Sequence, residues 1–314
     1  NVQQNVGSAT DGEYYAYHGY WASNFEELNP HLGSLADFHE LIDAAAEKGI
    51  NIIVDVVLNH AGYGAEETFE GMVRTKEEDK QGDDQLGSLS GLPDFKTEEA
   101  TVRNQLVAWQ ASWLKRSTTA KGNSIYGFRV DTVKHVDDTT WQHFKNELVD
   151  RDPDFHLIGE TWGANYKDTK GDLGIGTMDS LLDFGFKDIA KYLVNGQLKA
   201  AGKELEERSK VLTSAASLGQ FLGSHDEDGF LYSLGGAEKE GNLDKLKLAA
   251  SLLITAKGQP VIYYGEELGQ SGQNNWPAYD NRYDFDWSKV ETSDIEDHYQ
   301  KLLAFRNGNS TLLS

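Results

Sequence analysis

Six short apolar runs recur along the chain, and most of them end in groups that can take part in chemistry. Within each run the apolar residues are continuous rather than alternating, which is typical of strands buried on both faces of a parallel sheet. The predicted strands are INIIVDVVLNH (50–60), SIYGFRVD (124–131), FHLIGE (155–160), MDSLLDF (178–184), SLGQFLGSHD (217–226) and QPVIYYGEE (259–267).

Amphipathic stretches separate these runs, and they predict helices at 35–49, 98–116, 137–150, 242–258 and 293–308. Alternating strands and helices indicate an α/β fold. Reactive groups at the carboxyl ends of successive strands favour a (β/α)8 TIM barrel over an open sheet. Two of its eight strands are missing from this count. We expect either that these two strands were lost with the N-terminus or that they lack a clear apolar run and are missed by this pattern.

Residues 61–99 differ from the rest of the chain in composition and in hydrophobic pattern. They are rich in glycine and charge and keep neither a helical nor a strand period, which predicts a small irregular domain inserted after the third barrel strand. The expected organisation is therefore a barrel formed by residues 1–60 and 100–314, with a small domain inserted at 61–99.

Composition narrows the choice of partners. With 29 basic and 51 acidic residues the formal net charge is −22, which argues against binding to nucleic acid or to an anionic membrane surface. No apolar run approaches the roughly 20 residues needed to span a bilayer. The absence of cysteine excludes disulfides and thiolate chemistry. NVQQNVGSAT has no signal-peptide pattern, so we expect that any export signal was removed or lies upstream.

Three carboxylates, Asp131, Glu160 and Asp226, each end a different predicted strand. One such aspartate is more often a helix cap or turn former than a catalyst, but three on one barrel rim indicate a site. Glycoside hydrolysis needs two carboxyl groups in different protonation states. Arg129 lies two residues before Asp131, on the same face of its strand, where it would keep Asp131 ionised.

Histidines and aromatic residues occur near the same strand ends. His60, His135 and His225 lie close to the carboxylates in sequence and could bond sugar hydroxyls, although a lone histidine is usually structural. The tract YYAYHGYW (14–21) offers aromatic faces on which a pyranose ring could lie, although such a cluster is by default core.

Four segments resemble the sequence signatures of the α-amylase family, in the same order. They are DVVLNH (55–60), GFRVDTVKH (127–135), GETWG (159–163) and FLGSHD (221–226). AYHGYW (16–21) and GLPDF (91–95) extend the similarity over nearly the whole chain, which looks closest to bacterial α-amylases and amylopullulanases. Because the family barrel begins with two further strands and usually continues into a C-terminal β domain, we expect the chain to be a piece of a longer protein.

The resemblance implies roles for individual residues. Asp131 would be the nucleophile, Glu160 the acid/base and Asp226 the stabiliser of the transition state. The implied substrate-binding residues are His18, Tyr20, Trp21, His60, Arg129, Lys134, His135, His225 and Arg282. Lys134 and His135 would reach the leaving-group side. Arg282 is a fair match to a substrate-binding arginine of the family, whereas Asp280, two residues before it, is a doubtful match to the aspartate that often accompanies that arginine.

Calcium follows from the same resemblance. Its implied ligands are Asn59, Asp94 and the backbone carbonyl of His135, and hard oxygen ligands of this kind suit Ca²⁺. In the family this ion ties the inserted domain to the barrel.

The expected function is therefore retaining endo-hydrolysis of α-1,4-glucosidic bonds in starch-type glucans by a secreted monomer. Export is inferred from the polymeric substrate. Alternatives are a mixed α-1,4/α-1,6 activity of amylopullulanase or neopullulanase type, transglycosylation, and a non-catalytic glucan-binding barrel. The last is disfavoured because such barrels typically lose one of the three carboxylates. A phosphate enzyme would need a glycine-rich loop after a strand, and none is found.

Overall fold

The computed structural model describes residues 3–5, 16–167, 177–212 and 218–309. The chain divides into two units. Unit 1 comprises residues 1–162 and 170–179, and unit 2 comprises residues 163–169 and 180–314. The predicted strand at 217–226 begins outside the described ranges, as does the start of the aromatic tract at 14–21.

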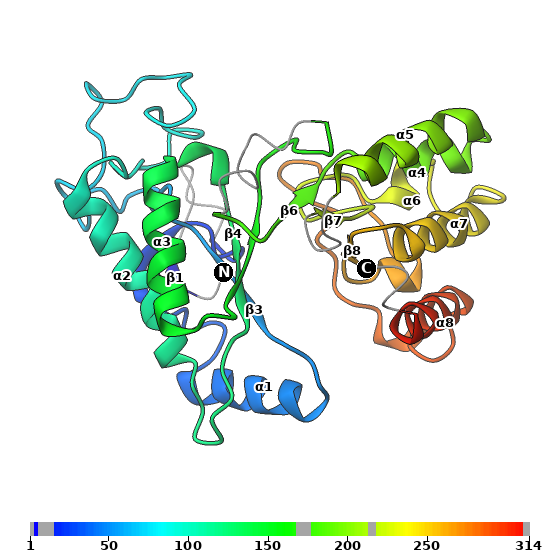
Figure 1. Ribbon diagram of the computed structural model, residues 1–314, viewed down its shortest axis with the longest axis horizontal. Coiled ribbons are helices and arrows are strands. Elements are labelled where there is room, and N and C mark those ends of the chain that lie inside the picture. The colour runs from blue at the N-terminus through cyan, green and yellow to red at the C-terminus, as the bar shows by residue number, and fades with distance from the viewer. Residues whose placement is uncertain (1–2, 6–15, 168–176, 213–217, 310–314) are drawn as a thin grey trace. The chain divides into compact units, whose positions relative to one another are not determined.

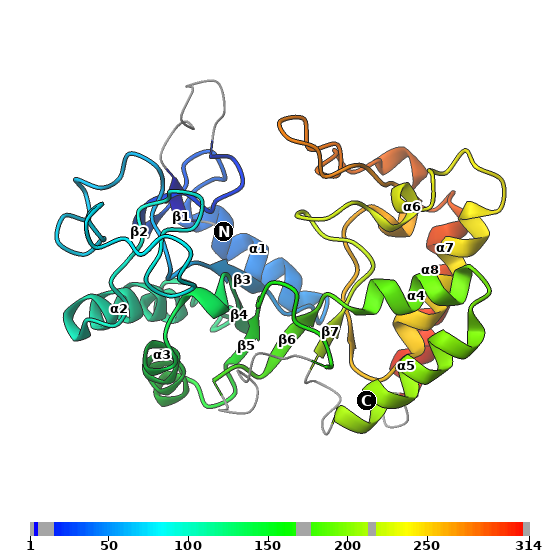
Figure 2. The ribbon, with the colours of Figure 1, turned by 90° about the horizontal axis from the view of Figure 1, so that it is seen from above.

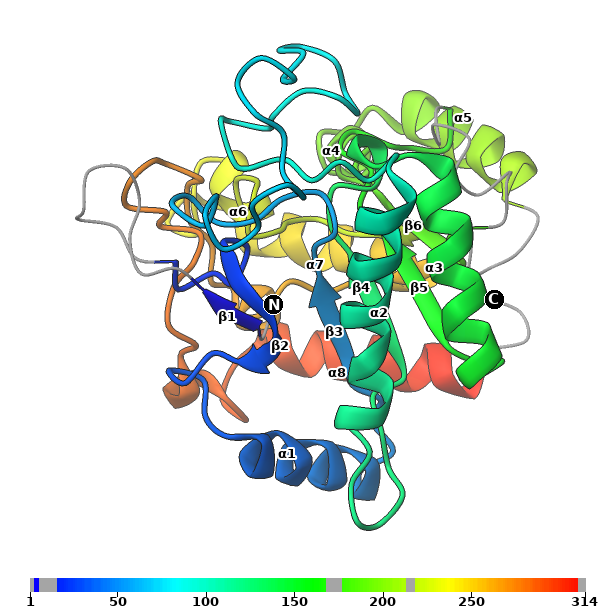
Figure 3. The same ribbon diagram turned by 90° about the vertical axis from the view of Figure 1, so that its left-hand side faces the viewer.

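Unit 1 holds three parallel strands, in the order β3 (Ile53–Val56), β4 (Gly127–Val130) and β5 (His156–Gly159). Helices α1 (Leu35–Glu47), α2 (Ala100–Arg116) and α3 (Asp138–Arg151) alternate with them, and α2 and α3 lie side by side (Figure 3). A short 3-10 helix, η1 (Val133–His135), follows β4. Each of these strands and α helices was predicted, and the strands are shorter than their apolar runs.

A separate antiparallel pair, β1 (Gln3–Asn5) and β2 (Ala22–Leu28), precedes them in unit 1. These strands were not predicted. They pair only with each other among the described residues, so they do not supply the two parallel strands missing from the expected barrel.

Unit 2 holds the other three parallel strands, β6 (Ser180–Asp183), β7 (Leu218–Gln220) and β8 (Gln259–Pro260). Its predicted helices are α7 (Asn242–Thr255) and α8 (Asp294–Gly308), which pack together (Figure 1). Helices α4 (Phe186–Val194), α5 (Leu198–Val211) and α6 (Phe230–Ser233) were not predicted; α4 lies against α5 and α7 (Figure 2). The short 3-10 helices η2 (Glu266–Leu268) and η3 (Trp287–Lys289) complete the unit.

Residues 61–99 contain turns and two isolated bridges but no helix or strand. Beyond the carboxyl end of β3 they form the cyan loops of Figure 3. An aromatic cluster fixes them to the rest of unit 1, because Phe69 and Phe95 pack on Phe25 of β2 and Phe69 also packs on Trp109 of α2. The irregular character of this segment agrees with the prediction. Its status as a separate domain stays a prediction.

Alternation along β4 decides which side chains reach the site. Phe128 and Val130 are fully buried, and Phe128 stacks on Phe144 of α3. Arg129, between them, points to the opposite face because successive side chains of a strand alternate. The helix-covered face of the strand is thus apolar, and its other face is left for charged groups.

In the described part of the chain, no helix is both long enough and apolar enough to cross a membrane.

Candidate active site

Asp131 and Glu160 follow the ends of the neighbouring strands β4 and β5. The backbone continues the sheet at both positions, since the Asp131 N–H donates to the Val56 carbonyl (2.9 Å) and the Glu160 N–H to the Val130 carbonyl (2.7 Å). Both residues are buried, with 8% and 6% of their surface exposed. In unit 1 the two predicted reacting carboxylates therefore stand on adjacent strand ends.

Arg129 is held between two carboxylates. It pairs with Asp131, as predicted, and its Nη1 also lies 3.1 Å from Oδ1 of Asp55 on β3. Burial opposes its charge, but Asp55 and Asp131 outweigh that effect and raise the pKa of the guanidinium well above its ordinary value. Arg129 is thus a fixed cation that holds the Asp131 carboxylate in place.

Tyr20 is anchored to the same group. Its hydroxyl donates to Oδ2 of Asp55 at 2.6 Å, and the Arg129 guanidinium lies 5.8 Å from its ring centroid. Burial, followed by the charge of Asp55, raises its pKa well above the ordinary value. Asp55 was missed as a site residue, although an aspartate within an apolar strand was a usable signal.

The backbone turn after Asp131 supports Glu160. Thr132 adopts a left-handed conformation (φ 50°), and its N–H donates to Oε2 of Glu160 at 2.9 Å. A positive φ is unusual for a β-branched residue, and such strain persists only where the surroundings hold it. The neighbouring Val133 N–H donates to the Glu160 carbonyl (2.9 Å). The turn therefore forms hydrogen bonds with both the side chain and the backbone of Glu160.

His60 lies among these groups as a buried imidazole. Burial lowers its pKa, while Asp131 and a hydrogen bond with the Tyr20 backbone act in the opposite direction. Of the other residues in the aromatic tract, His18 stacks on Tyr20 with 5.7 Å between ring centroids and meets the edge of Trp21 at 4.5 Å. The aromatic tract and His60 therefore share the neighbourhood of Asp131.

Lys134 and His135 contact the inserted segment. Lys134 Nζ lies 3.5 Å from Oδ1 of Asp84, and the His135 Nδ1 is 2.7 Å from the Asp84 carbonyl oxygen. Both side chains thus face residue 84, and the predicted contact with the leaving-group side stays untested.

The predicted calcium ligands Asn59 and Asp94 meet through the backbone. The Phe95 N–H donates to the Asn59 carbonyl (2.9 Å), and His60 and Asp94 form an isolated bridge. Asp94 is buried, and its Oδ2 accepts from Nε of Arg74 at 2.7 Å. Burial raises the pKa of Asp94 to about 7, although Arg74 acts to lower it.

By ligand type the predicted set suits a hard cation, because the buried Asn59 and Asp94 carry amide and carboxylate oxygens. That these oxygens meet the carbonyl of His135 stays a prediction. Arg74 was missed, and it already neutralises part of the charge of Asp94. Within the described ranges, no group of three or more histidine, aspartate or glutamate side chains is arranged to hold a metal. The predicted set uses one carboxylate, one amide and one backbone oxygen, so that result leaves it open.

Unit 2 carries the third carboxylate. Oδ2 of Asp226 lies 3.0 Å from Nε2 of His225, and Oδ1 lies 3.2 Å from Nη2 of Arg282. The Arg282 Nε also donates to the His225 carbonyl (3.0 Å). The predicted residues His225, Asp226 and Arg282 therefore form one cluster. Because Asp226 belongs to unit 2, its meeting with Asp131 and Glu160 stays a prediction.

Two asparagines that sequence reasoning missed hold this cluster. The buried Asn281 donates from Nδ2 to the carbonyls of His225 and Glu227, both at 3.0 Å. Asn274 donates to the Asp226 carbonyl at 2.7 Å. Asp280 bonds Asn275 and not the cluster, so its doubtful match to a family aspartate gains no support from its contacts.

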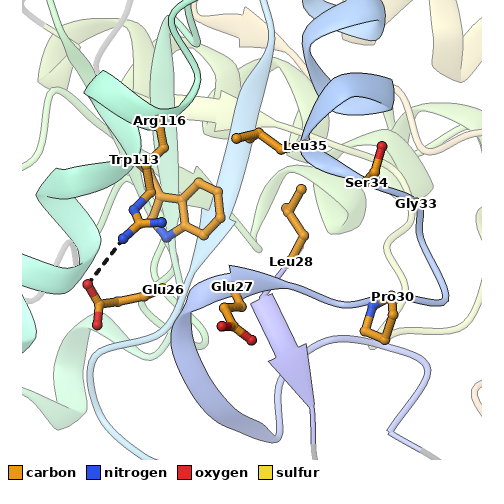
Figure 4. Close-up of a pocket in the computed structure, with 9 residues that line it drawn as sticks. All are labelled: Glu26, Glu27, Leu28, Pro30, Gly33, Ser34, Leu35, Trp113 and Arg116. Atoms are coloured by element: carbon orange, nitrogen blue, oxygen red, sulfur yellow. Dashed lines mark hydrogen bonds and ion pairs between the residues drawn. The ribbon is translucent and has the colours of Figure 1, made fainter.

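A pocket of about 300 Å³ lies elsewhere in unit 1 (Figure 4). Apolar groups of Leu28, Leu35 and Trp113 line it, and Glu26 pairs with Arg116 at its edge (3.2 Å). None of the predicted catalytic, substrate-binding or metal-binding residues lines it.

Comparisons with known proteins identify the family of the chain. The family description "Alpha amylase, catalytic domain" matches residues 6–84 and 86–310. Neopullulanase 2 of Thermoactinomyces vulgaris is 27% identical over 95% of this chain and 52% of its own length. The periplasmic alpha-amylase of Escherichia coli is 26% identical over 96% of this chain and 56% of its own. The chain thus spans about half the length of these curated relatives.

Among solved structures, an alpha-amylase from Geobacillus thermoleovorans complexed with acarbose is similar with a TM-score of 0.81 at 28% identity. The match covers 98% of this chain and 67% of the solved chain. An alpha-amylase from Anoxybacillus also gives a TM-score of 0.81, at 27% identity, over 99% of this chain and 67% of its own. Because the family description matches nearly the whole chain, the chain belongs to the alpha-amylase family of glycoside hydrolases.

Proposed function

We propose that this protein hydrolyses α-1,4-glucosidic bonds of starch-type glucans internally and with retention of configuration. The observation that carries the proposal is the pair of strand ends at Asp131 and Glu160, one carboxylate fixed by Arg129 and the other by the Thr132 N–H. Two carboxyl groups in different surroundings are what a retaining glycosidase needs.

In this mechanism Asp131 attacks the anomeric carbon while Glu160 protonates the departing glycosidic oxygen. The Thr132 N–H donates to Oε2 of Glu160 and so orients this carboxyl group. Water then attacks the glycosyl–Asp131 ester, with Glu160 taking a proton from it, and releases the sugar with its original configuration. Asp226, oriented by Arg282 and His225, stabilises the positive charge of the transition state.

This mechanism requires Asp226 to face Asp131 and Glu160. We therefore propose that the six parallel strands belong to a (β/α)8 barrel, in which strand ends meet on one rim. Residues 61–99 would be the inserted domain of that barrel.

Calcium is part of the proposal. Asn59, Asp94 and the His135 carbonyl would hold Ca²⁺, which would tie residues 61–99 to β3 and to the turn after β4. The ion would supply rigidity rather than a step of the reaction.

The alternative within the same chemistry is mixed cleavage of α-1,4 and α-1,6 bonds. It is favoured by the similarity to a protein named neopullulanase, which matches nearly the whole chain. Glucans with these bonds, such as starch and pullulan, are polymers that cannot enter a cell, so we propose that the protein works outside the cell. We also propose that it is a monomer.

Release of reducing sugar from soluble starch and from pullulan tests the proposal. The parent should cut starch, and cutting of pullulan would establish the mixed activity. Asp131→Asn should lower kcat by about 10³-fold or more, since it removes the nucleophile without changing the side-chain volume. Glucan binding without cleavage by the parent would instead identify a non-catalytic binding barrel.

A further inference from the structure

Hydrogen bonds hold the loop at 272–282 against the loop that carries Asp226. Asn274 bonds that loop twice, since its N–H donates to Oδ1 of Asp228 (2.8 Å) and its Nδ2 donates to the Asp226 carbonyl (2.7 Å). Asn281 adds its bonds to the carbonyls of residues 225 and 227. Any group displayed on this loop is therefore held at a fixed place relative to Asp226.

The tip of the loop is closed by reciprocal bonds between Asn275 and Asp280. Nδ2 of Asn275 donates to Oδ2 of Asp280, and the Asp280 N–H donates back to Oδ1 of Asn275, both at 2.9 Å. Tyr279 stands in this turn with a positive φ of 48°. A bulky residue in that conformation is strained, and such strain is typical of ligand-binding turns.

Arg282 connects the turn to the carboxylate. Its guanidinium carbon lies 3.9 Å from the ring centroid of Tyr279, while its Nη2 reaches Asp226. The Tyr279 ring thus rests on a cation that is itself fixed by the predicted stabilising carboxylate.

Trp276 extends this arrangement outward. Its ring meets Tyr279 edge to face with 5.7 Å between centroids, and 60% of its surface is exposed. More than half of its surface is therefore available to a ligand, on a turn that hydrogen bonds hold in place. The polar groups of Asn275 and Asp280 beside it suit the hydroxyls of a sugar better than the apolar face of a protein partner.

We propose that Trp276, supported by Tyr279, is a stacking platform for a glucose residue of the bound α-glucan at some distance from the bond being cut. The C–H face of a pyranose ring would lie on the indole, and the platform would favour long chains over short ones. This inference rests on the proposed function, because it assigns a further binding position to the same substrate.

Activity on maltoheptaose and on maltotriose tests the platform. In Trp276→Ala, kcat/KM for maltoheptaose should fall about tenfold more than kcat/KM for maltotriose. Trp276→Phe keeps an aromatic face and should recover most of that loss. The matched control is Trp287→Ala, which removes a tryptophan of η3 that is 77% exposed and should leave the ratio of the two substrates unchanged.

Calorimetric binding of maltoheptaose to Asp131→Asn, with and without Trp276→Ala, separates the platform from catalysis. The double variant should bind about tenfold more weakly. If the parent binds maltoheptaose in a Trp276-dependent way but cuts nothing, the proposed hydrolysis is wrong and the platform stands. If the parent is active and Trp276→Ala changes neither the substrate ratio nor binding, the platform is wrong. Failure of the parent both to bind and to cut would overturn both.

Discussion

Asp55 and Arg129 face each other in the register of β3 and β4, and their side chains meet at 3.1 Å. This pair makes Arg129 a shared cation, since the same guanidinium also holds Asp131. Asp55 in turn receives the Tyr20 hydroxyl. A residue one strand away from the predicted nucleophile therefore positions both the cation and the aromatic ring beside it.

Asp55→Asn should weaken both the fold and the reaction. Removing one partner of a largely buried pair is expected to lower the free energy of unfolding by about 1–3 kcal/mol, and a misplaced Arg129 should lower kcat by about tenfold or more. Urea denaturation and starch hydrolysis measure the two effects. Glu47→Gln, which breaks an exposed pair with Lys121, should leave the stability nearly unchanged. Parent-like activity of Asp55→Asn would show that Arg129 needs no second carboxylate.

Gly127, at the start of β4, has no room for a methyl group. A Cβ there would lie 2.4 Å from the backbone oxygen of His156 on β5. Gly127→Ala should therefore destabilise the protein by about 1–3 kcal/mol and lower activity, because the same strand carries Arg129. Thermal denaturation followed by circular dichroism measures the change.

Gly202 provides the matched control for that exchange. It lies within α5, where a Cβ would meet nothing within 4 Å. Gly202→Ala should stabilise by about 0.5–1 kcal/mol, since alanine favours a helix interior. Equal effects of the two exchanges would mean that the β4–β5 contact is not tight.

The sequence located the strand-end carboxylates because a charged group at the end of an apolar run is a local pattern. Arg129 was predictable from strand alternation, and its meeting with Asp131 is confirmed. Asn274 and Asn281 could not be found in this way, because each acts through hydrogen bonds to a backbone about 50 residues away.

The predicted elements of the fold are likewise those with a local sequence pattern. Each predicted strand formed, but β8 keeps only two residues of its nine-residue run, because pairing partners rather than apolar character set a strand's length. Helix α4 was missed although Phe186, Ile189 and Ala190 carry a helical spacing. Strands β1 and β2 were missed because neither QQN nor ASNFEEL is a continuous apolar run.

Glu266 should give the stability of the protein a distinct pH dependence. This carboxyl is buried in unit 2 and accepts the Tyr299 hydroxyl at 2.7 Å. Burial raises its pKa from 4.5 to about 8. The folded protein keeps a proton that the unfolded chain releases, so the free energy of unfolding should fall as pH rises from about 4.5 to about 8.

Glu266→Gln removes that titration while keeping an acceptor for Tyr299. The difference in unfolding free energy between parent and variant should change by about 1.4 kcal/mol per pH unit inside this window and level off above it. Urea denaturation at several pH values measures the slope. Glu240→Gln, an exposed glutamate of the same unit, should keep the parent slope. Parallel curves for the parent and Glu266→Gln would contradict an uncharged Glu266.

Asp94 should make the protein's stability depend on calcium. If Asn59, Asp94 and the His135 carbonyl hold Ca²⁺, a chelator should lower the Tm of the parent, and Asp94→Asn should abolish most of that response. Arg74→Met gives a sharper test, because it leaves Asp94 buried with no cation from Arg74. In chelator the loss should reach about 3–5 kcal/mol, and added Ca²⁺ should recover part of it by supplying the missing charge.

The control for this test is Glu78→Gln, which breaks the pair with Lys96 in the same inserted segment (2.9 Å). Because Glu78 is exposed, its exchange should change the Tm only slightly and leave the calcium response intact. An equal loss for Arg74→Met with and without Ca²⁺ would mean that Arg74 alone compensates Asp94. The inserted segment would then be held by this ion pair and by the packing of Phe69 and Phe95, with no metal required.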